Sequence, residues 1–593
     1  MYKKIISALL FSCLFLLLFT ACNSSDELTQ PSSSTDQEVN LDNSGETVAD
    51  ALADNEADHE STDDYSWSAS GATQISLNRD QITVSGSGAT ASASTCTISA
   101  AGTYLVSGSL NNGQLLIDTD DLDPVKLVLN GASLNNSNTA PLFVKSAGKT
   151  VIILANNTEN TITDGASYVF EGDDDEPNAA LFSKDPLSFS GNGSLSVTGN
   201  YNDGITSKDG LIIAGGNITV KASDDGIRGK DYLVIKNGGI TVNAGGDGLK
   251  SDNDKDETRG YIYIQEGTLN ITAGGDAIAA ETDALIAGGT LNLSAGGGSN
   301  KNVSGDASAK GIKALVQLII DDGDLNIDSA DDALHSNKYL TINDGSLLIA
   351  SNDDGIHADS LLSINGSDIN ITKSYEGIES RIAILIQDGN IHLTSSDDGL
   401  NVAGGIDGSG WHGGGGPGGE DSGNYHLYIH GGYIVVNANG DGLDSNGSIE
   451  MTGGTVLVNG PTGNNNGALD HSSFKLTGGI LVAAGSSGMA QAPSSTSTQY
   501  SVLVNFRSSQ SAGTLFHVQT SAGNGILSFK PEKRYQSVVF STPEIQNGET
   551  YEIYVGGSST GTQVDGLYEN GEYSPGTKSA SLTVNNIVTK ISG

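Results

Sequence analysis

An acidic residue recurs along the middle of the chain two positions before an Ile or Leu, usually with Gly between them. Within two runs every step is 22 residues. A fixed period in the twenties is typical of one structural unit stacked on itself, so these carboxylates are expected to lie one above another. We call this column the acid ladder. Its members are Asp203, Asp225 and Asp247, then Asp332, Asp354, Glu376 and Asp398.

Stacked carboxylates repel one another. Unit charges on neighbouring strands, about 4.8 Å apart, repel by about 0.9 kcal/mol in bulk water and several-fold more at reduced dielectric. Either some carboxylates stay protonated, or a hard divalent cation bridges them. Calcium suits this pattern because it takes roughly six to eight oxygen ligands in flexible geometry. We therefore predict Ca2+ as a cofactor, with metal ligands among Asp203, Asp224, Asp225, Asp247, Asp331, Asp332, Asp353, Asp354, Asp397 and Asp398.

An alternative role for these acids is to cap Gly-containing turns, as Asp commonly does, and both roles can hold together. The period also has breaks. Lys310 takes the acidic position in one repeat, and the steps from Asp247 to Asp276 and from Asp398 to Asp441 exceed 22. Calcium is therefore expected in separate clusters and not in one continuous ladder.

A second column consists of the residues that follow the Ile or Leu and should point outward, because the Ile or Leu points inward. It changes along the chain from basic to imidazole to acidic. It could be a solvated face or a binding strip beside the acid ladder. His335 and His357 are stacked neighbours in it, which also allows a transition metal. The ligand-binding candidates in this column are Arg228, Lys250, Lys313, His335, His357 and Glu379.

The elements that must position these columns are short strands. Each repeat holds three runs of alternating apolar residues joined by Gly-containing turns, such as Leu233–Ile235 and Ile240–Val242. Three strands and three turns in about 22 residues describe one coil of a parallel β-helix, and no segment shows sustained helical periodicity. The nonapeptide calcium β-roll is the competing fold for a Gly- and Asp-rich chain, and its period does not fit.

The repeats divide the chain into five parts. We predict a signal peptide at 1–21, a disordered acidic tether at 22–70, an N-terminal β-rich cap with the first coils at 71–200, and the β-helix repeats at 201–490. A small C-terminal β domain at 491–593 is expected to cover the open end of the stack. A Gly-rich insertion at 404–423 carries Trp411 and His412 and is either a flap over a binding face or a tolerated insertion.

The first residues predict export. Lys3 and Lys4 precede the apolar stretch Ile5–Phe19, which is short for a membrane-spanning helix. The segment ends in Leu18-Phe19-Thr20-Ala21-Cys22, which resembles a bacterial lipoprotein lipobox with Phe19 as a departure; an ordinary secretory signal is the alternative. We expect Cys22 to carry lipid and anchor the protein outside the cytoplasm, at a membrane or the cell surface. Cys96 is then the only other thiol of the exported chain, so an internal disulfide is excluded.

The charge balance limits the partners. The formal net charge of −43, from 71 acids and 28 bases, would repel nucleic acid and anionic lipid. Cations, and through cations anionic polymers, remain possible partners. We expect a monomer that binds a polysaccharide and no nucleic acid.

Several motifs resemble a known family of secreted bacterial carbohydrate-binding β-helix proteins, similar to calcium-dependent polysaccharide lyases of the pectate type. The matching segments are Gly102–Gly108, Asn160–Gly165 and Asn178–Lys184, together with the Asp-Asp-Gly-Ile coils and the insertion at 404–423. The resemblance covers roughly residues 73 to 590. It implies a right-handed parallel β-helix, bound calcium, and binding of plant-type polysaccharides such as cellulose or polygalacturonate.

Three functions follow from these observations. The leading one is calcium-assisted, non-catalytic polysaccharide binding. The second is a calcium-dependent uronate lyase, in which a Lys or Arg removes the proton α to the uronate carboxylate. Lys250 is the candidate base, with Arg228 and Lys313 as other options that no spacing excludes. The third is a structural adhesin that binds no glycan. An acidic glycan suits the Asp columns better than cellulose, because Trp67 and Trp411 are the only tryptophans and neither lies in a column.

Overall fold

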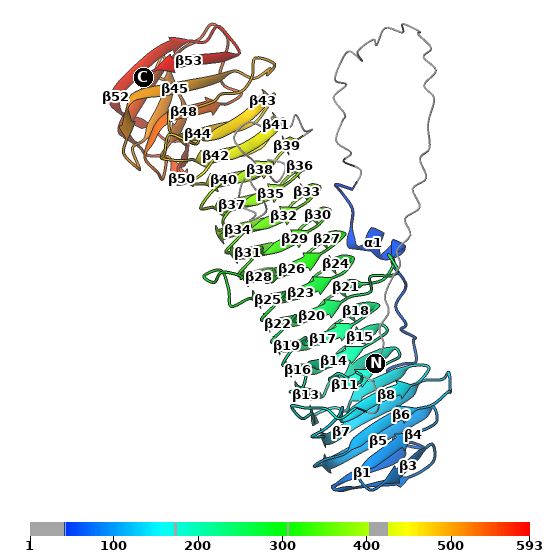
Figure 1. The fold of residues 1–593 in the computed structure, drawn as a ribbon. Helices are drawn as coiled ribbons and strands as arrows, with labels where there is room; N and C mark the ends of the chain where they lie inside the picture. Colours follow the sequence, from blue (N-terminus) through cyan, green and yellow to red (C-terminus); the bar gives the residue numbers. More distant parts are fainter. Residues whose placement is uncertain (1–40, 42, 171–174, 305–306, 403–424) are drawn as a thin grey trace, which may run out of the picture. The chain divides into compact units, whose positions relative to one another are not determined.

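Short strands stacked in three columns make up most of the described chain (Figure 1). The computed structural model describes residues 41, 43–170, 175–304, 307–402 and 425–593. Within these ranges the protein is nearly all β, with a single helix, and most strands join one long sheet of mainly parallel pairs. This confirms the predicted all-β class and is compatible with the predicted parallel β-helix. We call three consecutive strands, one from each column, a coil.

The first column follows the acid-ladder turns. Its strands from the first repeat onward are β14 (Asp203–Ser207), β17 (Ile227–Gly229), β20 (Leu249–Ser251), β23 (Ile278–Ala280), β26 (Ile312–Ala314), β29 (Leu334–Ser336), β32 (Ile356–Ala358), β35 (Ile378–Ser380), β38 (Leu400–Val402), β41 (Leu443–Met451) and β43 (Leu469–Leu476).

The second column consists of β15 (Leu211–Ile213), β18 (Tyr232–Ile235), β21 (Tyr261–Ile264), β24 (Asp283–Ile286), β27 (Gln317–Ile320), β30 (Tyr339–Ile342), β33 (Leu361–Ile364), β36 (Ala383–Ile386) and β39 (His426–Ile429). The third consists of β16 (Asn217–Ala222), β19 (Gly239–Ala244), β22 (Thr268–Ala273), β25 (Thr290–Ala295), β28 (Asp324–Ser329), β31 (Ser346–Ser351), β34 (Asp368–Lys373), β37 (Asn390–Thr394), β40 (Tyr433–Asn437), β42 (Thr455–Asn459) and β44 (Ile480–Gly485).

The columns extend into the N-terminal part, where β1 and β2, and likewise β3 and β4, pair antiparallel. Its strands are β1 (Thr73–Arg79), β2 (Gln81–Ser85), β3 (Ala89–Ser92), β4 (Thr95–Ile98), β5 (Gly102–Leu110), β6 (Gln114–Asp118), β7 (Val125–Asn135), β8 (Leu142–Ser146), β9 (Thr150–Leu154), β10 (Glu159–Thr163), β11 (Ala179–Ser183), β12 (Leu187–Gly191) and β13 (Ser194–Gly199).

Aliphatic side chains fill the interior between the columns. Third-column strands alternate exposed and buried residues, as in β16, so their Ile, Val and Leu side chains point inward. In the first column one Ile or Leu per coil is buried. Parallel register keeps these residues opposite one another even across insertions, as in the pairs Leu249↔Ile278 and Leu400↔Leu443. Each buried aliphatic contributes roughly 1.5–3 kcal/mol, so the stacked core can stabilise the fold without a disulfide. Cys96 is a free, buried thiol.

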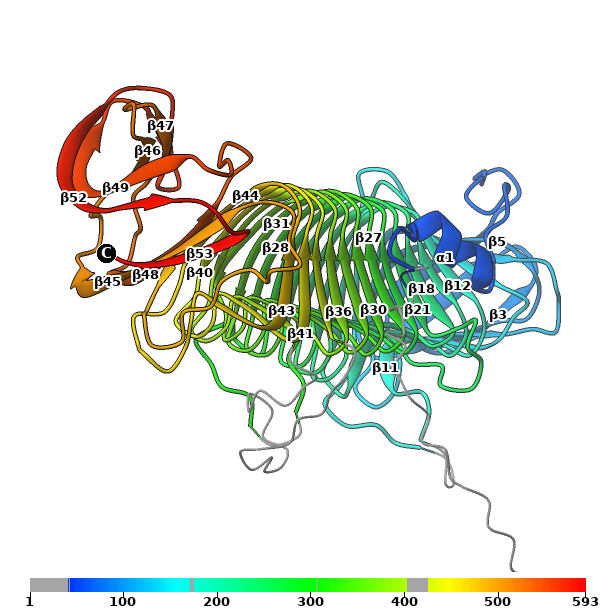
Figure 2. The same cartoon turned by 90° about the horizontal axis from the view of Figure 1, so that it is seen from above.

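Residues 43–70 lie against the second column, which differs from the predicted disordered tether through residue 70. Helix α1 (Val48–Asp54) begins with a capping box in which Thr47 and Asp50 bond reciprocally. Its buried residues Val48 and Ala51 pack with aliphatic residues of β24 and β27. Figures 1 and 2 show the helix beside the strands of this column. No described helix has the length and apolar character needed to span a membrane.

The C-terminal strands belong to two sheets. β48 pairs antiparallel with β44, the last strand of the third column, and with β45, which pairs parallel with β53. The other strands form a separate six-stranded antiparallel sheet. Their bounds are β45 (Ser501–Gln510), β46 (Phe516–Thr520), β47 (Gly525–Phe529), β48 (Tyr535–Ser541), β49 (Thr550–Ser559), β50 (Thr562–Val564), β51 (Leu567–Glu569), β52 (Tyr573–Thr583) and β53 (Val588–Ser592).

Candidate functional site

The acid ladder occupies the turns that precede the first-column strands. Ile205 lies opposite Ile227 in parallel register, so the acids two residues earlier stack as the period predicted. The intervening glycine is needed where coils approach closely. A Cβ on Gly226 would lie 2.3 Å from Val242 Cγ1 and 2.6 Å from a backbone oxygen of the next coil. The Gly therefore allows close stacking, and the acid before it is held at the turn.

One oxygen of most ladder carboxylates caps the backbone of the next coil. The carboxylate accepts a hydrogen bond from the amide N–H of the equivalent residue one coil later, which leaves few buried amides without partners. The N···Oδ1 distances are 3.3 Å from Asp225 to Asp203, 2.9 Å from Asp247 to Asp225, 2.9 Å from Asp276 to Asp247, 2.7 Å from Lys310 to Asp276 and 3.1 Å from Asp354 to Asp332. The turn-capping role predicted for these acids is present.

The second oxygen usually faces the outward column, which is not a solvated face. Thr206, Glu379 and Asn401 of that column are buried, and its Arg, Lys and His members contact ladder acids. The contacts to the acid three residues earlier are Thr206–Asp203 at 3.0 Å, Lys250–Asp247 at 2.7 Å, His335–Asp332 at 2.8 Å and His357–Asp354 at 3.1 Å. Lys313, which follows Lys310 in place of a ladder acid, lies 3.7 Å from Asp276 of the preceding coil. We call this the partner column, since its cations and hydroxyls offset the ladder's charge.

The first three coils of the ladder combine burial with crowded charge. Burial and the neighbouring Asp225 raise the pKa of Asp203 to about 7. Burial also raises the pKa of Asp225, although Lys250 lies 3.1 Å away and opposes the shift. Arg228 pairs with Asp252 and lies 3.9 Å from Asp203. The predicted ligand-binding cations Arg228 and Lys250 are thus engaged with acids of this chain.

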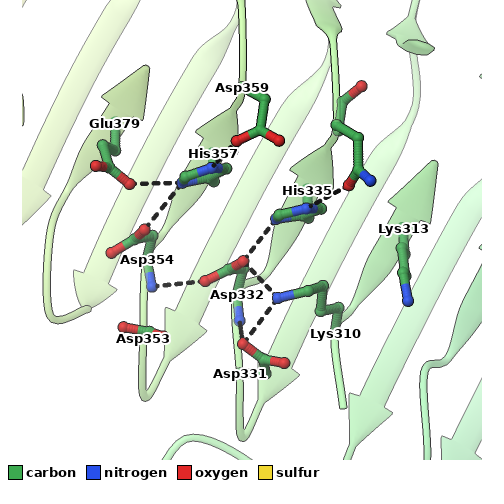
Figure 3. Close-up of polar contacts among 12 residues, drawn as sticks. Lys310, Lys313, Asp331, Asp332, His335, Asp353, Asp354, His357, Asp359 and Glu379 are labelled. Carbon is green, nitrogen blue, oxygen red and sulfur yellow. Dashed lines mark hydrogen bonds and ion pairs between the residues drawn. The ribbon is translucent and has the colours of Figure 1, made fainter. Parts of the chain in front are cut away.

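The central cluster of Asp331, Asp332 and Asp353 already surrounds a cation. One carboxylate oxygen of each lies within 4.8 Å of the others. The Lys310 ammonium lies 2.8 Å from Asp331 and 2.6 Å from Asp332 (Figure 3). Burial alone would raise the pKa of Asp332, but Lys310 and His335 hold it well below its usual value. Burial and the adjacent Asp354 raise the pKa of Asp353 to about 8. A lysine therefore occupies the position where calcium was predicted.

A second cluster contains only carboxylates. Asp398, Asp441 and Asp444 each place one oxygen within 4.8 Å of the other two, and all are half-buried. Asp444 stands in the partner column opposite Asn401, whereas coils further back carry Lys250, Lys313, His335 and His357 in this column. Burial and the nearby Asp470 raise the pKa of Asp441 to about 6. This donor set has the hard oxygen chemistry that calcium prefers.

A third cluster is mixed. Asp354, His357 and Glu379 place one carboxylate or imidazole atom each within 4.8 Å of one another. The predicted metal ligands Asp203, Asp224, Asp225 and Asp247 form none of these three clusters, and Asp224 is exposed. Asp397 lies beside the carboxylate cluster and accepts a hydrogen bond of 2.7 Å from Tyr375.

The sequence prediction omitted three residues from the site. Lys310 fills one cluster, while Asp441 and Asp444 complete another. Aligning the repeats on the buried Ile or Leu places Asp441 two positions before Leu443 and Asp444 directly after it, so both acids can be located from the sequence although the predicted ligands did not include them. The insertion with Trp411 and His412 lies outside the described residues, as do the signal segment and Cys22.

One family model and two known proteins are similar to this chain. The sequence model of a family described as "Carbohydrate-binding domain-containing protein" matches residues 92–355 and 345–502. A curated relative with the same description, from Acetivibrio thermocellus, is 44% identical over 122 residues, which are 20% of this chain. The match spans 43% of that relative, less than half its length.

A solved structure is also similar in sequence. It is described as "Structure of the polysaccharide lyase-like protein from C. thermocellum, Gadolinium derivative" and is 28% identical to this chain. The alignment covers 49% of this chain and 96% of that chain, with a TM-score of 0.36.

Proposed function

The chain belongs to the carbohydrate-binding domain family whose sequence model matches most of its length, and from that premise we propose that it binds an acidic polysaccharide through calcium. The calcium would be held by Asp398, Asp441 and Asp444, and the protein would act without catalysis. The observation that carries this proposal is the convergence of three half-buried carboxylates within 4.8 Å. The fold in this proposal is a right-handed parallel β-helix with coils of about 22 residues and a C-terminal β domain.

The chemistry of the cluster favours a divalent cation. Three carboxylates at this separation repel one another, and the raised pKa of Asp441 reflects burial and neighbouring acids. Calcium would relieve that repulsion and retain free coordination positions, because it takes roughly six to eight oxygen ligands. A uronate carboxylate on the glycan could occupy such a position. Polygalacturonate therefore fits this site better than cellulose, which has no carboxylate.

The decisive experiment is a pull-down of the full chain on polygalacturonate with calcium and with a chelator. We expect binding only with calcium, and loss of binding in a variant carrying both Asp441→Asn and Asp444→Asn. Asp344→Asn is the matched control, since it removes the charge of an exposed turn acid in another coil. Calcium-dependent binding that survives in the double variant would refute this site. No binding to any of a panel of polysaccharides, in either condition, would refute the function.

The lyase alternative is weaker on physical grounds. A general base must be deprotonated to accept a proton, and a pKa near the working pH favours that state. Burial would lower the pKa of Lys250, but Asp247 and Asp225, 2.7 and 3.1 Å away, raise it above its usual value. Incubation with polygalacturonate and calcium should therefore yield no unsaturated product by ultraviolet absorbance. A product that disappears in Lys250→Ala would establish the lyase instead.

We also propose that the protein works outside the cytoplasm, held to a membrane by lipid on Cys22. The support is the lipobox-like segment Leu18–Cys22 behind a short apolar stretch. Mass spectrometry of the protein from its native membrane should find a lipid-modified N-terminal Cys, and Cys22→Ser should release the chain from the membrane fraction. An unmodified N-terminus beyond residue 22 would indicate an ordinary secretory signal.

A further inference from the structure

His357 stands among three carboxylates, and its surroundings differ from those of every other ladder coil. It lies in β32, directly opposite Glu379 of β35 in parallel register. Its Nδ1 atom is 2.6 Å from Glu379 Oε2 and 3.1 Å from Asp354 Oδ2 (Figure 3). Its Nε2 atom is 3.3 Å from Asp359 Oδ1. Both ring nitrogens therefore face carboxylate oxygens.

The Nδ1 edge has more acceptors than one proton can serve. An imidazole nitrogen carries at most one N–H, which points along a single direction in the ring plane. Two carboxylate oxygens from different coils nevertheless converge on Nδ1. Figure 3 shows the Asp354 and Glu379 carboxylates at the same edge of the His357 ring. Such convergence of anionic atoms favours positive charge at this edge, which either a doubly protonated ring or a bound divalent cation supplies.

Asp354 supplies a second, independent observation. The residue is 4% exposed, and its Oδ1 atom is buried without a hydrogen-bond partner. In the preceding coil the equivalent Oδ1 of Asp332 accepts the Asp354 amide at 3.1 Å. A buried carboxylate oxygen without a partner is destabilising, so it calls for a ligand that the protein does not itself supply.

We propose that Asp354, His357 and Glu379 bind a divalent transition metal of the zinc class. One imidazole nitrogen and two carboxylates are donors that zinc accepts, and water would fill the remaining position. Calcium is disfavoured here because it takes oxygen ligands. Metal–ligand bonds of about 2.0–2.1 Å require the donor atoms to move apart by several tenths of an ångström. The metal would replace the Nδ1 proton, and Asp359 would accept the Nε2–H and orient the ring.

The neighbouring coil provides a matched control. His335 stacks on His357 with ring centroids 4.8 Å apart and an interplanar angle of 6°. Its Nδ1 contacts only one acid, Asp332 at 2.8 Å, and its Nε2 lies 2.9 Å from the amide oxygen of Asn337. Asp332 is already paired with the Lys310 ammonium. His335 thus shares the column, the stacking and the acid three residues earlier, but lacks the second carboxylate.

The test uses the full chain freed of metal by a chelator and then titrated with Zn2+ by calorimetry in the presence of excess Ca2+. We expect one zinc per chain at this site, with affinity lowered about tenfold or more in His357→Gln and in Glu379→Gln. Asp359→Asn, a change in the orienting residue, should weaken binding by about 10–100-fold. His335→Gln should leave zinc affinity unchanged. Far-ultraviolet circular dichroism and thermal melting establish that each variant is folded.

A spectroscopic measurement distinguishes metal bound by His357 from metal bound nonspecifically at the surface. Co2+ in place of zinc should give the visible absorption of a low-symmetry nitrogen- and oxygen-liganded ion, and that band should vanish in His357→Gln. Equal zinc affinity in wild type and His357→Gln, displacement of zinc by Ca2+, or equal losses in His335→Gln and His357→Gln would each overturn the proposal. Calcium-dependent glycan binding should survive in His357→Gln, so the two proposed sites can fail independently.

Discussion

At the scale of single residues, most ladder acids serve two partners. One oxygen caps the amide of the following coil, and the other faces a partner-column side chain, as Asp225 does with the Asp247 amide and Lys250. A carboxylate is suited to this because it has two acceptor oxygens and a negative charge. The repulsion predicted from stacking is thus relieved first by amides and lysines of the chain, and calcium is proposed only where the partner column turns acidic.

Asp225→Ala tests the capping role. The substitution leaves the buried Asp247 amide without an acceptor and removes one of the two acids of Lys250, so we expect a loss of about 1–3 kcal/mol in the free energy of unfolding. Asp225→Asn keeps an acceptor oxygen and should lose less. The midpoint of urea denaturation, followed by circular dichroism, measures both. Asp324→Ala, an exposed acid of β28, is the control. Equal midpoints for Asp225→Ala and this control would contradict the capping role.

At the scale of elements, residues 43–70 form a strap on the second column. His59 lies between the hydroxyls of Tyr232 and Ser188, 2.8 Å from each. Lys149 pairs with the almost fully buried Asp64 at 2.7 Å. Lys236 pairs with Asp58 and Glu60 at 2.8 and 2.6 Å. The strap is therefore held by polar contacts together with the apolar face of α1.

Acid should loosen the strap. Burial and Lys149 lower the pKa of His59 to about 4, whereas a released His59 would titrate near its ordinary value of 6.5. Between these values the released state binds the additional proton. Docking is therefore strongest above about pH 6.5 and weakens by up to about 3 kcal/mol as the pH falls toward 4.

Hydrogen exchange of residues 43–70 at several pH values measures this effect. Protection should decrease from pH 7 to pH 5 in the wild type, and His59→Gln should remove most of that pH dependence while weakening docking at pH 7. His392→Gln, a change at a histidine of β37 in the third column, should leave the dependence intact. Neighbouring Asp58, Asp64, Lys149 and Lys236 face His59, so a pH dependence that persists in His59→Gln would assign the effect to those groups.

The sequence predicted the columns but not their side-chain partners. The period of 22 and the buried Ile and Leu residues were sufficient for the stack, since parallel register follows from them. The pairing of Lys250 with two acids, or of Lys310 with Asp331 and Asp332, depends on side-chain direction, which spacing does not determine. The contacts of residues 43–70 with the second column were not predicted, because this segment is polar and its partners lie far away in the sequence, as in the bonds from Val48 to Asp321 and from His59 to Tyr232.

At the scale of the whole described chain, the C-terminal strands protect the last coil. β48 pairs with β44 along its edge, with Val482 opposite Phe540. Val435, Leu457 and Val482, on the outer face of the third column, pack in one cluster with apolar residues of β45 and β48. Without them, the unpaired backbone of β44 and an apolar face would both be exposed to solvent.

Removing residues 491–593 should therefore cause association. We expect the truncated chain to elute as dimers or larger species in size-exclusion chromatography with light scattering, at concentrations where the full chain remains monomeric. Val482→Lys in the truncated chain should reduce association, because an exposed lysine opposes edge pairing and apolar contact. A truncated chain that stays monomeric and cooperative in unfolding would show that the stack needs no cover at this end.

The net charge of −43 determines how salt should affect glycan binding. A protein of this charge and polygalacturonate repel each other, so binding requires either a bridging cation or contacts strong enough to overcome repulsion. If calcium bridges them, added NaCl should weaken binding by screening the attraction of Ca2+ for carboxylates. If direct contacts dominate, added NaCl should strengthen binding by screening the repulsion, even with a chelator present.

We expect the result for a calcium bridge. In the presence of calcium the affinity for polygalacturonate should fall as NaCl is added, and in the presence of a chelator no binding should occur at any NaCl concentration. Mg2+ should substitute poorly, because it demands near-octahedral geometry and loses its water reluctantly. Fully methyl-esterified polygalacturonate, which lacks the bridging carboxylates, should not bind. Calorimetric titrations across NaCl concentrations measure these affinities. Binding that strengthens with NaCl in the presence of chelator would move the recognition away from Asp398, Asp441 and Asp444 and toward uncharged groups of the coils.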